Sequence, residues 1–214
     1  MRARVDAFHR EVARVALTVA NRYGFVLGGG VAWVMSGLVQ RPTEDVDLFT
    51  TNDGAAGAAA DEVRAALEAA GFRVEEEAAE LVAGFDQDQR EFLVSDGERT
   101  VVLSLGRLDR QHSPVMMDVG PVMHIDDLAA TKVAALVNRR EVRDYIDVAA
   151  ALRHYTVEQL LTLARRQDPG LEPEDIVAAG RYLDRLNDRR FTYYGQTQEQ
   201  IEMIREALVS WPRA

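Results

Sequence analysis

The sequence contains no cysteine and only one lysine. Without cysteine the chain forms no disulfide, offers no thiolate nucleophile and builds no cysteine zinc site, which fits a reducing compartment. Of its 25 basic residues, 24 are arginine and one is Lys132. A lysine ammonium is a compact point charge that arginine does not reproduce at a phosphate, so Lys132 becomes informative if its position has an independent role. The four histidines are scattered along the sequence, without the spacing of metal ligands.

Long apolar runs and an excess of positive charge are also missing. No segment approaches the ~20 apolar residues of a membrane span, and residues 1–24 have the pattern of an amphipathic helix instead of a signal peptide. We therefore expect a cytoplasmic protein without a membrane partner. The net charge of −10 argues against broad, non-specific nucleic-acid binding. Clusters of arginine leave two alternatives open, a local basic groove or solvated helix faces: Arg139, Arg140 and Arg143, Arg165 and Arg166, and Arg189 and Arg190.

Residues 1–122 alternate between helical and strand patterns. Apolar residues at three- and four-residue steps predict helices, β-rich runs predict strands, and the DG dipeptide in "REFLVSDGERTVVLSLG" predicts a hairpin turn. The expected order is a helix over 3–21, a strand over 25–27, a glycine turn, a helix over 31–36, a strand over 45–50, an alanine-rich helix ending at Gly71, a strand from Phe72, the hairpin, and one more strand in "PVMMDVG".

From Asp126 the pattern is helical to the end of the chain. Asp126, Thr156 and Thr197 have side chains typical of helix N-caps, and Pro173 falls near a helix start. The sequence therefore predicts an α+β fold, with a mixed sheet flanked by helices in residues 1–122 and a helical bundle in residues 123–214.

Two acids fall on one predicted strand, in "EDVDLFT". Side chains alternate along a strand, so Asp45 and Asp47 share one face while Val46 and Leu48 enter the core. Two carboxylates so close together are costly unless a cation lies between them, and Mg²⁺ prefers carboxylate and phosphate oxygens. The pair therefore indicates a magnesium site for phosphoryl transfer. The alternative is that both acids are merely solvated at a strand end.

Two further motifs contain residues suited to the same chemistry. The segment "LGGG" lies between a strand and a helix, where its backbone N–H groups can receive a phosphate; the alternative is a plain chain reversal. In "VMMDVG", Asp118 lies on another predicted strand, where a third carboxylate can bind metal or accept the proton of an attacking hydroxyl. The alternative for Asp118 is a turn before Gly120.

These motifs resemble a known family. The segment "GGVAWVMSGLVQRPTEDVDLF" is similar to the first motif of polymerase-β-type nucleotidyltransferases, and its Arg-x-Thr-x-Asp-x-Asp-Leu-Phe form resembles AbiEii-type abortive-infection toxins and the related MenT toxins. The segment "DDLAATKVAALVNRREVRDYIDVAAAL" resembles that family's lysine-bearing helix and the Arg-Asp-x-x-Asp helix after it. The matching motifs cover residues 25–50 and 115–153 in the expected order, and the other elements match in general character only. The resemblance implies a polymerase-β-like fold whose helical domain completes the active-site cleft.

The resemblance also implies roles for residues of the first motif. Gly29 and Gly30 would hold the nucleotide's phosphates, together with Arg41 and Thr43 of the same motif. The family often has serine after the first glycine, so Gly30 lacks a hydroxyl contact to phosphate. Thr43 matches a position that can be phosphorylated in MenT-like toxins. A phosphate dianion there, beside the first acid of the motif, would repel the incoming triphosphate.

In the same way, the resemblance implies roles for the acids and for the single lysine. Asp45 and Asp47 would bind the metal, with Asp118 as the third carboxylate. Lys132 falls on the family's helix lysine and would contact the triphosphate, although a surface role stays open. The family also has an essential acid on the following helix, and the sequence does not decide between its two candidates. These are Asp144 and Asp147, whose alternative role is to pair with Arg140 or Arg143 across a helical turn.

We therefore expect a Mg²⁺-dependent nucleotidyltransferase toxin with a cognate antitoxin. An acceptor hydroxyl attacks the α-phosphorus of an NTP, an NMP is transferred and pyrophosphate leaves. The resemblance favours the tRNA 3′ end as acceptor, so that added nucleotides block translation. The alternatives are an enzyme of the same fold acting on a protein or small-molecule hydroxyl, and a catalytically silent binding protein. The sequence does not give the base preference or the oligomeric state.

Overall fold

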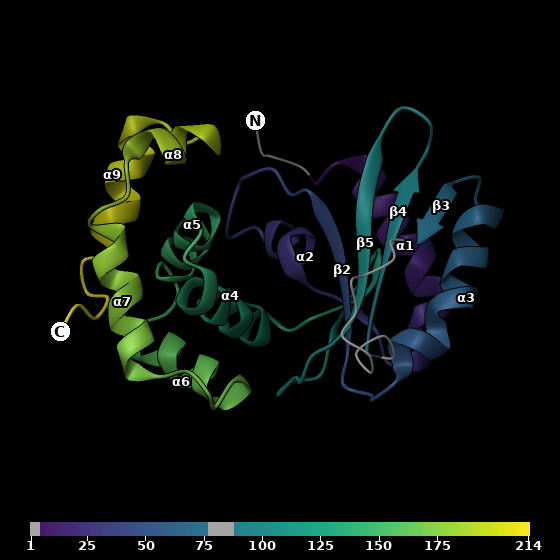
Figure 1. The fold of residues 1–214 in the computed structure, drawn as a ribbon, viewed down its shortest axis with the longest axis horizontal. Helices are drawn as coiled ribbons and strands as arrows, with labels where there is room; N and C mark the ends of the chain where they lie inside the picture. The colour runs from purple at the N-terminus through teal and green to yellow at the C-terminus, as the bar shows by residue number, and fades with distance from the viewer. Residues whose placement is uncertain (1–4, 77–87) are drawn as a thin grey trace. The chain divides into compact units, whose positions relative to one another are not determined.

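The structure, a computed structural model, describes residues 5–76 and 88–214, and its contacts divide the chain into two units (Figure 1). The first unit comprises Met1–Ser36 and Pro42–His124, and the second comprises Gly37–Arg41 and Ile125–Ala214. Segment Gly37–Arg41 thus belongs to the helical unit, which a single boundary at residue 122 does not anticipate. Within the described ranges, no helix has the length and apolar character needed to cross a membrane.

The described part of the first unit contains a mixed, seven-stranded sheet with the order β3-β4-β5-β2-β1-β7-β6. β2 pairs in parallel with β5, and β1 with β7, while the other neighbours are antiparallel. The mixed sheet predicted from the sequence is confirmed. Its strands are β1 (Val26–Leu27), β2 (Asp45–Thr50), β3 (Arg73–Glu76), β4 (Gln89–Ser95), β5 (Thr100–Arg107), β6 (Val115–Met117) and β7 (Gly120–Val122).

The helices of the first unit pack against this sheet, and α1 and α3 lie side by side (Figure 1). Asp6 caps α1, since its side chain accepts a hydrogen bond from Phe8 N at 2.8 Å. The inward face of β2 is fully buried, with Val46 and Leu48 0% exposed. The helices are α1 (Ala7–Ala20), the 3₁₀ turn η1 (Asn21–Tyr23), α2 (Gly29–Met35) and α3 (Ala55–Ala69).

Two local predictions differ from the structure. The helix expected from Val31 begins two residues earlier, at Gly29, so the second and third glycines of "LGGG" form its first turn. The single strand expected in "PVMMDVG" is wrong, because β6 and β7 form an antiparallel hairpin with Asp118 and Val119 in the turn. Gly120 has φ +120°, a conformation that favours glycine and lets the chain reverse there.

The second unit is helical, as predicted, but α4 begins at Ile125, so the N-cap expected at Asp126 is wrong and Asp126 lies in the first turn of the helix. Thr156 and Thr197 begin α6 and α9 with reciprocal capping boxes, and Pro173 is the first residue of α7. The sequence did not predict α8, because six residues are too few for a periodic apolar pattern. The helices are α4 (Ile125–Arg139), α5 (Val142–Ala151), α6 (Val157–Gln167), α7 (Pro173–Leu183), α8 (Asp188–Tyr193) and α9 (Gln198–Ala207).

Candidate active site

Asp45 and Asp47 lie on the same face of β2, opposite the buried valine and leucine of that strand. Both acids are half-buried, as the alternating burial of the strand shows. In the neighbouring strand β5, Val102 is paired with Asp45 and Ser104 with Asp47. The adjacent strand therefore contributes a hydroxyl beside Asp47, and no carboxylate. Sequence patterns did not reveal Ser104, because its relation to Asp47 depends on strand pairing.

The glycine segment packs directly against these acids. Gly28 N donates a hydrogen bond to Asp47 O at 2.8 Å, which fixes the start of α2 on β2. Gly29 has φ +58°, and a Cβ at this position would overlap Asp47 Oδ2 far inside van der Waals contact. A Cβ at Gly28 would meet the ring of Phe49. The glycines therefore do more than reverse the chain, because the missing Cβ of Gly29 lets the Asp47 carboxylate lie directly against the backbone where α2 begins.

The residues at this position fit a hard divalent cation. Asp45 and Asp47 provide carboxylate oxygens from one strand face, and the missing side chain of Gly29 lets the Asp47 carboxylate lie against the backbone of α2. Mg²⁺ is usually bound by one or two carboxylates plus substrate phosphates and water. The backbone N–H groups of Gly29 and Gly30 lie in the first turn of α2, where the helix provides no acceptor for them. The first unit thus brings two carboxylates and two backbone N–H donors together at one place.

Asp118 lies apart from this arrangement, and the prediction that it lies on a strand is wrong; its role as a third carboxylate stays a prediction, which this placement does not support. It lies in the turn after β6 and forms an ion pair with Arg10 of α1. β6 is an edge strand, and β1 and β7 separate it from β2. Since neighbouring strands are about 4.8 Å apart, three steps across the sheet amount to roughly 14 Å.

In the second unit, Asp147 holds two cations. Arg41 donates from Nε and Nη2 to the two carboxylate oxygens of Asp147, each at 2.7 Å. Lys132 Nζ lies 3.1 Å from Asp147 Oδ2. All three residues are buried, and Asp147 is only 1% exposed. One acid between two cations leaves this cluster with a net positive charge, which suits an anionic ligand.

The environment of Arg41 keeps it charged. Burial by itself lowers the pKa of Arg41, but the hydrogen bonds and the charge of Asp147 outweigh burial, and the pKa is raised. Lys132 is the only lysine of the chain, and its place in this buried cluster gives it the independent role that composition could not show.

Asp144 has a different set of partners from Asp147. Arg139 donates to its carboxylate from Nε and Nη2, at 3.0 Å and 2.8 Å for the shorter contacts. The same carboxylate accepts a hydrogen bond from Glu141 N at 3.1 Å, which forms part of the capping box of α5. Asp144 therefore fixes the N-terminus of α5, whereas Asp147 positions two cations. The pairing across a turn considered from the sequence is not formed, because Arg140 pairs with Asp175 and Arg143 with Glu141.

Thr43 is half-buried and lies two residues before Asp45 in the chain. Its hydroxyl donates to Asp45 O over 3.5 Å, a long hydrogen bond that leaves the oxygen weakly held. Phosphorylation of Thr43 stays a prediction.

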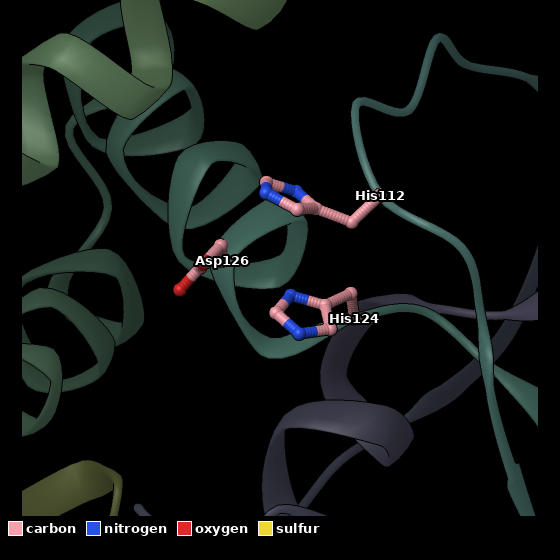
Figure 2. Close-up of side chains that lie close together, drawn as sticks. All are labelled: His112, His124 and Asp126. Atoms are coloured by element: carbon pink, nitrogen blue, oxygen red, sulfur yellow. The ribbon is translucent and has the colours of Figure 1, made fainter.

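Two histidines also come together in the first unit. Figure 2 shows His112 and His124 facing each other, and their rings stack with centroids 4.7 Å apart and an angle of 23° between the planes. The sequence gave no spacing signal for this pair, because the β6–β7 hairpin lies between the two residues and brings them together.

A mixed sheet with two acids beside a glycine turn, followed by a helical unit, is the arrangement expected of the nucleotidyltransferases that the sequence motifs resemble. The family model described as "Nucleotidyl transferase AbiEii toxin, Type IV TA system" matches residues 12–208. The chain therefore belongs to the AbiEii family of nucleotidyltransferase toxins of type IV toxin–antitoxin systems. The family and enzyme class predicted from the motifs are confirmed.

Solved structures agree with this fold. MenT4, a nucleotidyltransferase toxin from Mycobacterium tuberculosis H37Rv, matches with a TM-score of 0.61 and 16% sequence identity, over 95% of this chain and 82% of that one. JHP933 from Helicobacter pylori matches with a TM-score of 0.59 and 16% identity, over 94% of this chain and 87% of that one. None of the curated protein sequences compared with the chain matches it.

Proposed function

We propose that the chain transfers an NMP from an NTP to the 3′-terminal hydroxyl of a tRNA, with Mg²⁺ as cofactor and a cognate antitoxin as partner. The acceptor oxygen forms a bond to the α-phosphorus, the bond from that phosphorus to the bridging oxygen breaks, and pyrophosphate leaves as the hydroxyl proton is released. The observation that supports this most directly is the close approach of the Asp47 carboxylate to the backbone of Gly29, where α2 begins.

The residues of the first unit act on the phosphates. Asp45 and Asp47 would hold Mg²⁺, which supplies neutralisation of phosphate charge when bound. The N–H groups of Gly29 and Gly30 donate to phosphate oxygens, as backbone amides at a helix start do. With Asp118 placed elsewhere, the two acids of β2 are the carboxylates available for the metal in our proposal.

The second unit offers buried cations whose charge suits a triphosphate. Arg41 and Lys132 offset the negative charge of the triphosphate, and Asp147 keeps both cations in position through the buried ion pairs. Of the two acids of α5, we therefore assign Asp147 as a positioning residue, and its buried ion pairs support this choice. Asp144 stabilises the helix on which Asp147 lies.

The experiment compares wild type with Asp47→Asn, using each α-³²P-labelled NTP, Mg²⁺ and purified tRNA. We expect label on tRNA 3′ ends with wild type and a rate lower by roughly 1,000-fold with Asp47→Asn, because charge neutralisation by a bound metal contributes several kcal/mol. Asp61→Asn is the matched control, since it removes an exposed carboxylate from α3. Growth assays of the same variants and sequencing of tRNA 3′ ends complete the comparison.

Two results would contradict the proposal in different ways. If Asp47→Asn transfers label as fast as wild type, β2 is not the catalytic strand. If label appears on added protein extract or small hydroxyl compounds but not on tRNA, the nucleotidyltransferase activity holds and the acceptor is wrong.

A further inference from the structure

A hollow of about 270 Å³ in the second unit is lined by six residues, of which three are arginines. It lies where α7 packs beside the junction between α4 and α5, and no residue of the proposed catalytic machinery contributes to it. Three guanidinium groups face one carboxylate, and a tyrosine ring completes the wall. The lining residues are Arg140, Glu174, Ala178, Arg181, Tyr182 and Arg185.

The ion pairs around this hollow leave it positive. Arg140 Nη2 pairs with Asp175 Oδ1 at 2.6 Å, so one of the three charges is offset. Arg181 donates from Nε to the backbone carbonyl of Arg213 at 2.8 Å, which orients the group without neutralising it. In the part of the chain that the structure describes, Arg185 makes no ion pair. Arg190 adds a fourth guanidinium at the rim, where its Nη1 donates to the hydroxyl of Tyr182 at 3.0 Å.

Arg140 is kept at this place despite two local costs. Its φ is +57°, and it is the only non-glycine residue with positive φ in the described ranges. Glycine would adopt this conformation at the end of α4 without strain. Its Nε is also buried without a hydrogen-bond partner among the described residues. Strained positions of this kind persist where the side chain has a role, and the side chain here lines the basic hollow.

We propose that this hollow, formed by Arg140, Arg181 and Arg185, binds a backbone phosphate of the acceptor RNA. The inference rests on the proposed function, because it assigns the acceptor a second contact, made by residues other than those that act on the NTP. Arginine forks match phosphate oxygens, and the partly exposed ring of Tyr182 offers a surface on which a base can stack.

The charge balance of the two units favours RNA at this place. The sequence of the first unit has 11 basic and 20 acidic residues, whereas that of the second has 14 and 15. A polyanion therefore meets less repulsion on the second unit, and its contacts must come from local groups of arginine such as this one.

The test measures binding of fluorescent tRNA to the full chain, without NTP, over a range of salt concentrations. Arg181→Gln/Arg185→Gln should weaken binding at 0.1 M salt by at least about tenfold and reduce the slope of log Kd against log salt by roughly 2, as expected for two lost phosphate contacts. The matched control is Arg165→Gln/Arg166→Gln, which removes two exposed arginines from α6 and should change affinity by no more than about twofold.

Two single variants separate binding from folding. Arg140→Gly removes the guanidinium and relieves the positive φ, so tRNA binding should weaken while the unfolding midpoint stays the same or rises. Glu174→Gln removes the opposing carboxylate, so tRNA binding should tighten. If Arg140→Gly and the Arg181/Arg185 double variant both bind tRNA like wild type, the inference is overturned.

Further measurements on the same variants identify what the hollow binds. Equal weakening by both arginine pairs indicates a general charge effect and overturns the inference. If the Arg181/Arg185 variant loses binding of ATP or of an acidic peptide while keeping tRNA, the hollow belongs to the nucleotide or to a protein partner, and the inference is again overturned. Transfer to tRNA that is unchanged in this variant leaves the proposed function intact, whereas tRNA binding without transfer contradicts only the proposed function.

Discussion

The two units use aspartate in opposite ways. On β2, Asp45 and Asp47 share a half-exposed strand face with glycine backbone beside them, an arrangement suited to a cation brought from outside. On α5, Asp147 is buried and already holds Arg41 and Lys132. In our proposal the same side chain binds a ligand in one unit and acts as an internal counter-ion in the other. Exposure, and not residue type, distinguishes the two roles.

The largest expected effect comes from removing the internal counter-ion. Asp147→Asn leaves two buried cations without their shared negative charge, which should lower the free energy of unfolding by about 3 to 5 kcal/mol. Asp144→Asn should cost only about 1 to 2 kcal/mol, because Asn retains some capping ability and Arg139 can reach solvent. Urea unfolding of both variants measures the difference.

A double variant controls for general damage to α5. Arg41→Gln combined with Asp147→Asn removes one of the two cations that Asp147→Asn leaves without a counter-ion. The loss of unfolding free energy in the double variant should therefore be smaller than the sum of the losses in the two single variants. Strict additivity, or equal costs for Asp147→Asn and Asp144→Asn, contradicts the distinction between the two acids. A KM for NTP that rises in Asp147→Asn and not in Asp144→Asn supports a positioning role, because only Asp147 holds the two cations.

The second-largest effect should come from the close contact between Gly29 and the Asp47 carboxylate. Gly29→Ala places a Cβ against the Asp47 carboxylate and keeps a positive φ that alanine adopts poorly. We expect loss of transfer activity by about 100-fold, the size that follows a misplacement of about 1 Å in a catalytic site, and a stability loss of about 1 to 3 kcal/mol. The rate of labelled NMP transfer and thermal unfolding measure the two quantities.

Gly37→Ala is the matched control for this variant. Gly37 has φ +80°, but nothing lies within 4 Å of an added Cβ. It therefore imposes a similar backbone strain without a clash. If Gly37→Ala and Gly29→Ala reduce activity equally, backbone strain explains the loss, and the clash of the added Cβ with the Asp47 carboxylate does not.

The sequence predicted those structural features that depend on residues close together in the chain. The alternation around Asp45 and Asp47 follows from the period of a strand, and the capping boxes at Thr156 and Thr197 are short motifs. The motif resemblance supplied the family and the fold, and the family match supports both.

The rest depends on contacts between distant residues. The sequence could not separate Asp144 from Asp147, because the deciding partner, Arg41, lies 106 positions before Asp147. It also could not show that segment Gly37–Arg41 belongs with the helices, or that Ser104 lies beside Asp47, since pairing and packing set both. Periodicity describes which way a side chain points and does not describe what it meets.

The smallest effect should come from Asp118, the acid that the sequence placed with the metal ligands. Its ion pair with Arg10 is exposed, so Asp118→Asn should change stability by less than about 0.5 kcal/mol. Transfer activity should stay within about twofold of wild type, because a substitution at a remote surface position usually changes energies by no more than about 0.5 kcal/mol. The same assay run beside Asp47→Asn provides the contrast. A loss in Asp118→Asn comparable to that in Asp47→Asn would return Asp118 to the catalytic centre and break the assignment of the metal to β2 alone.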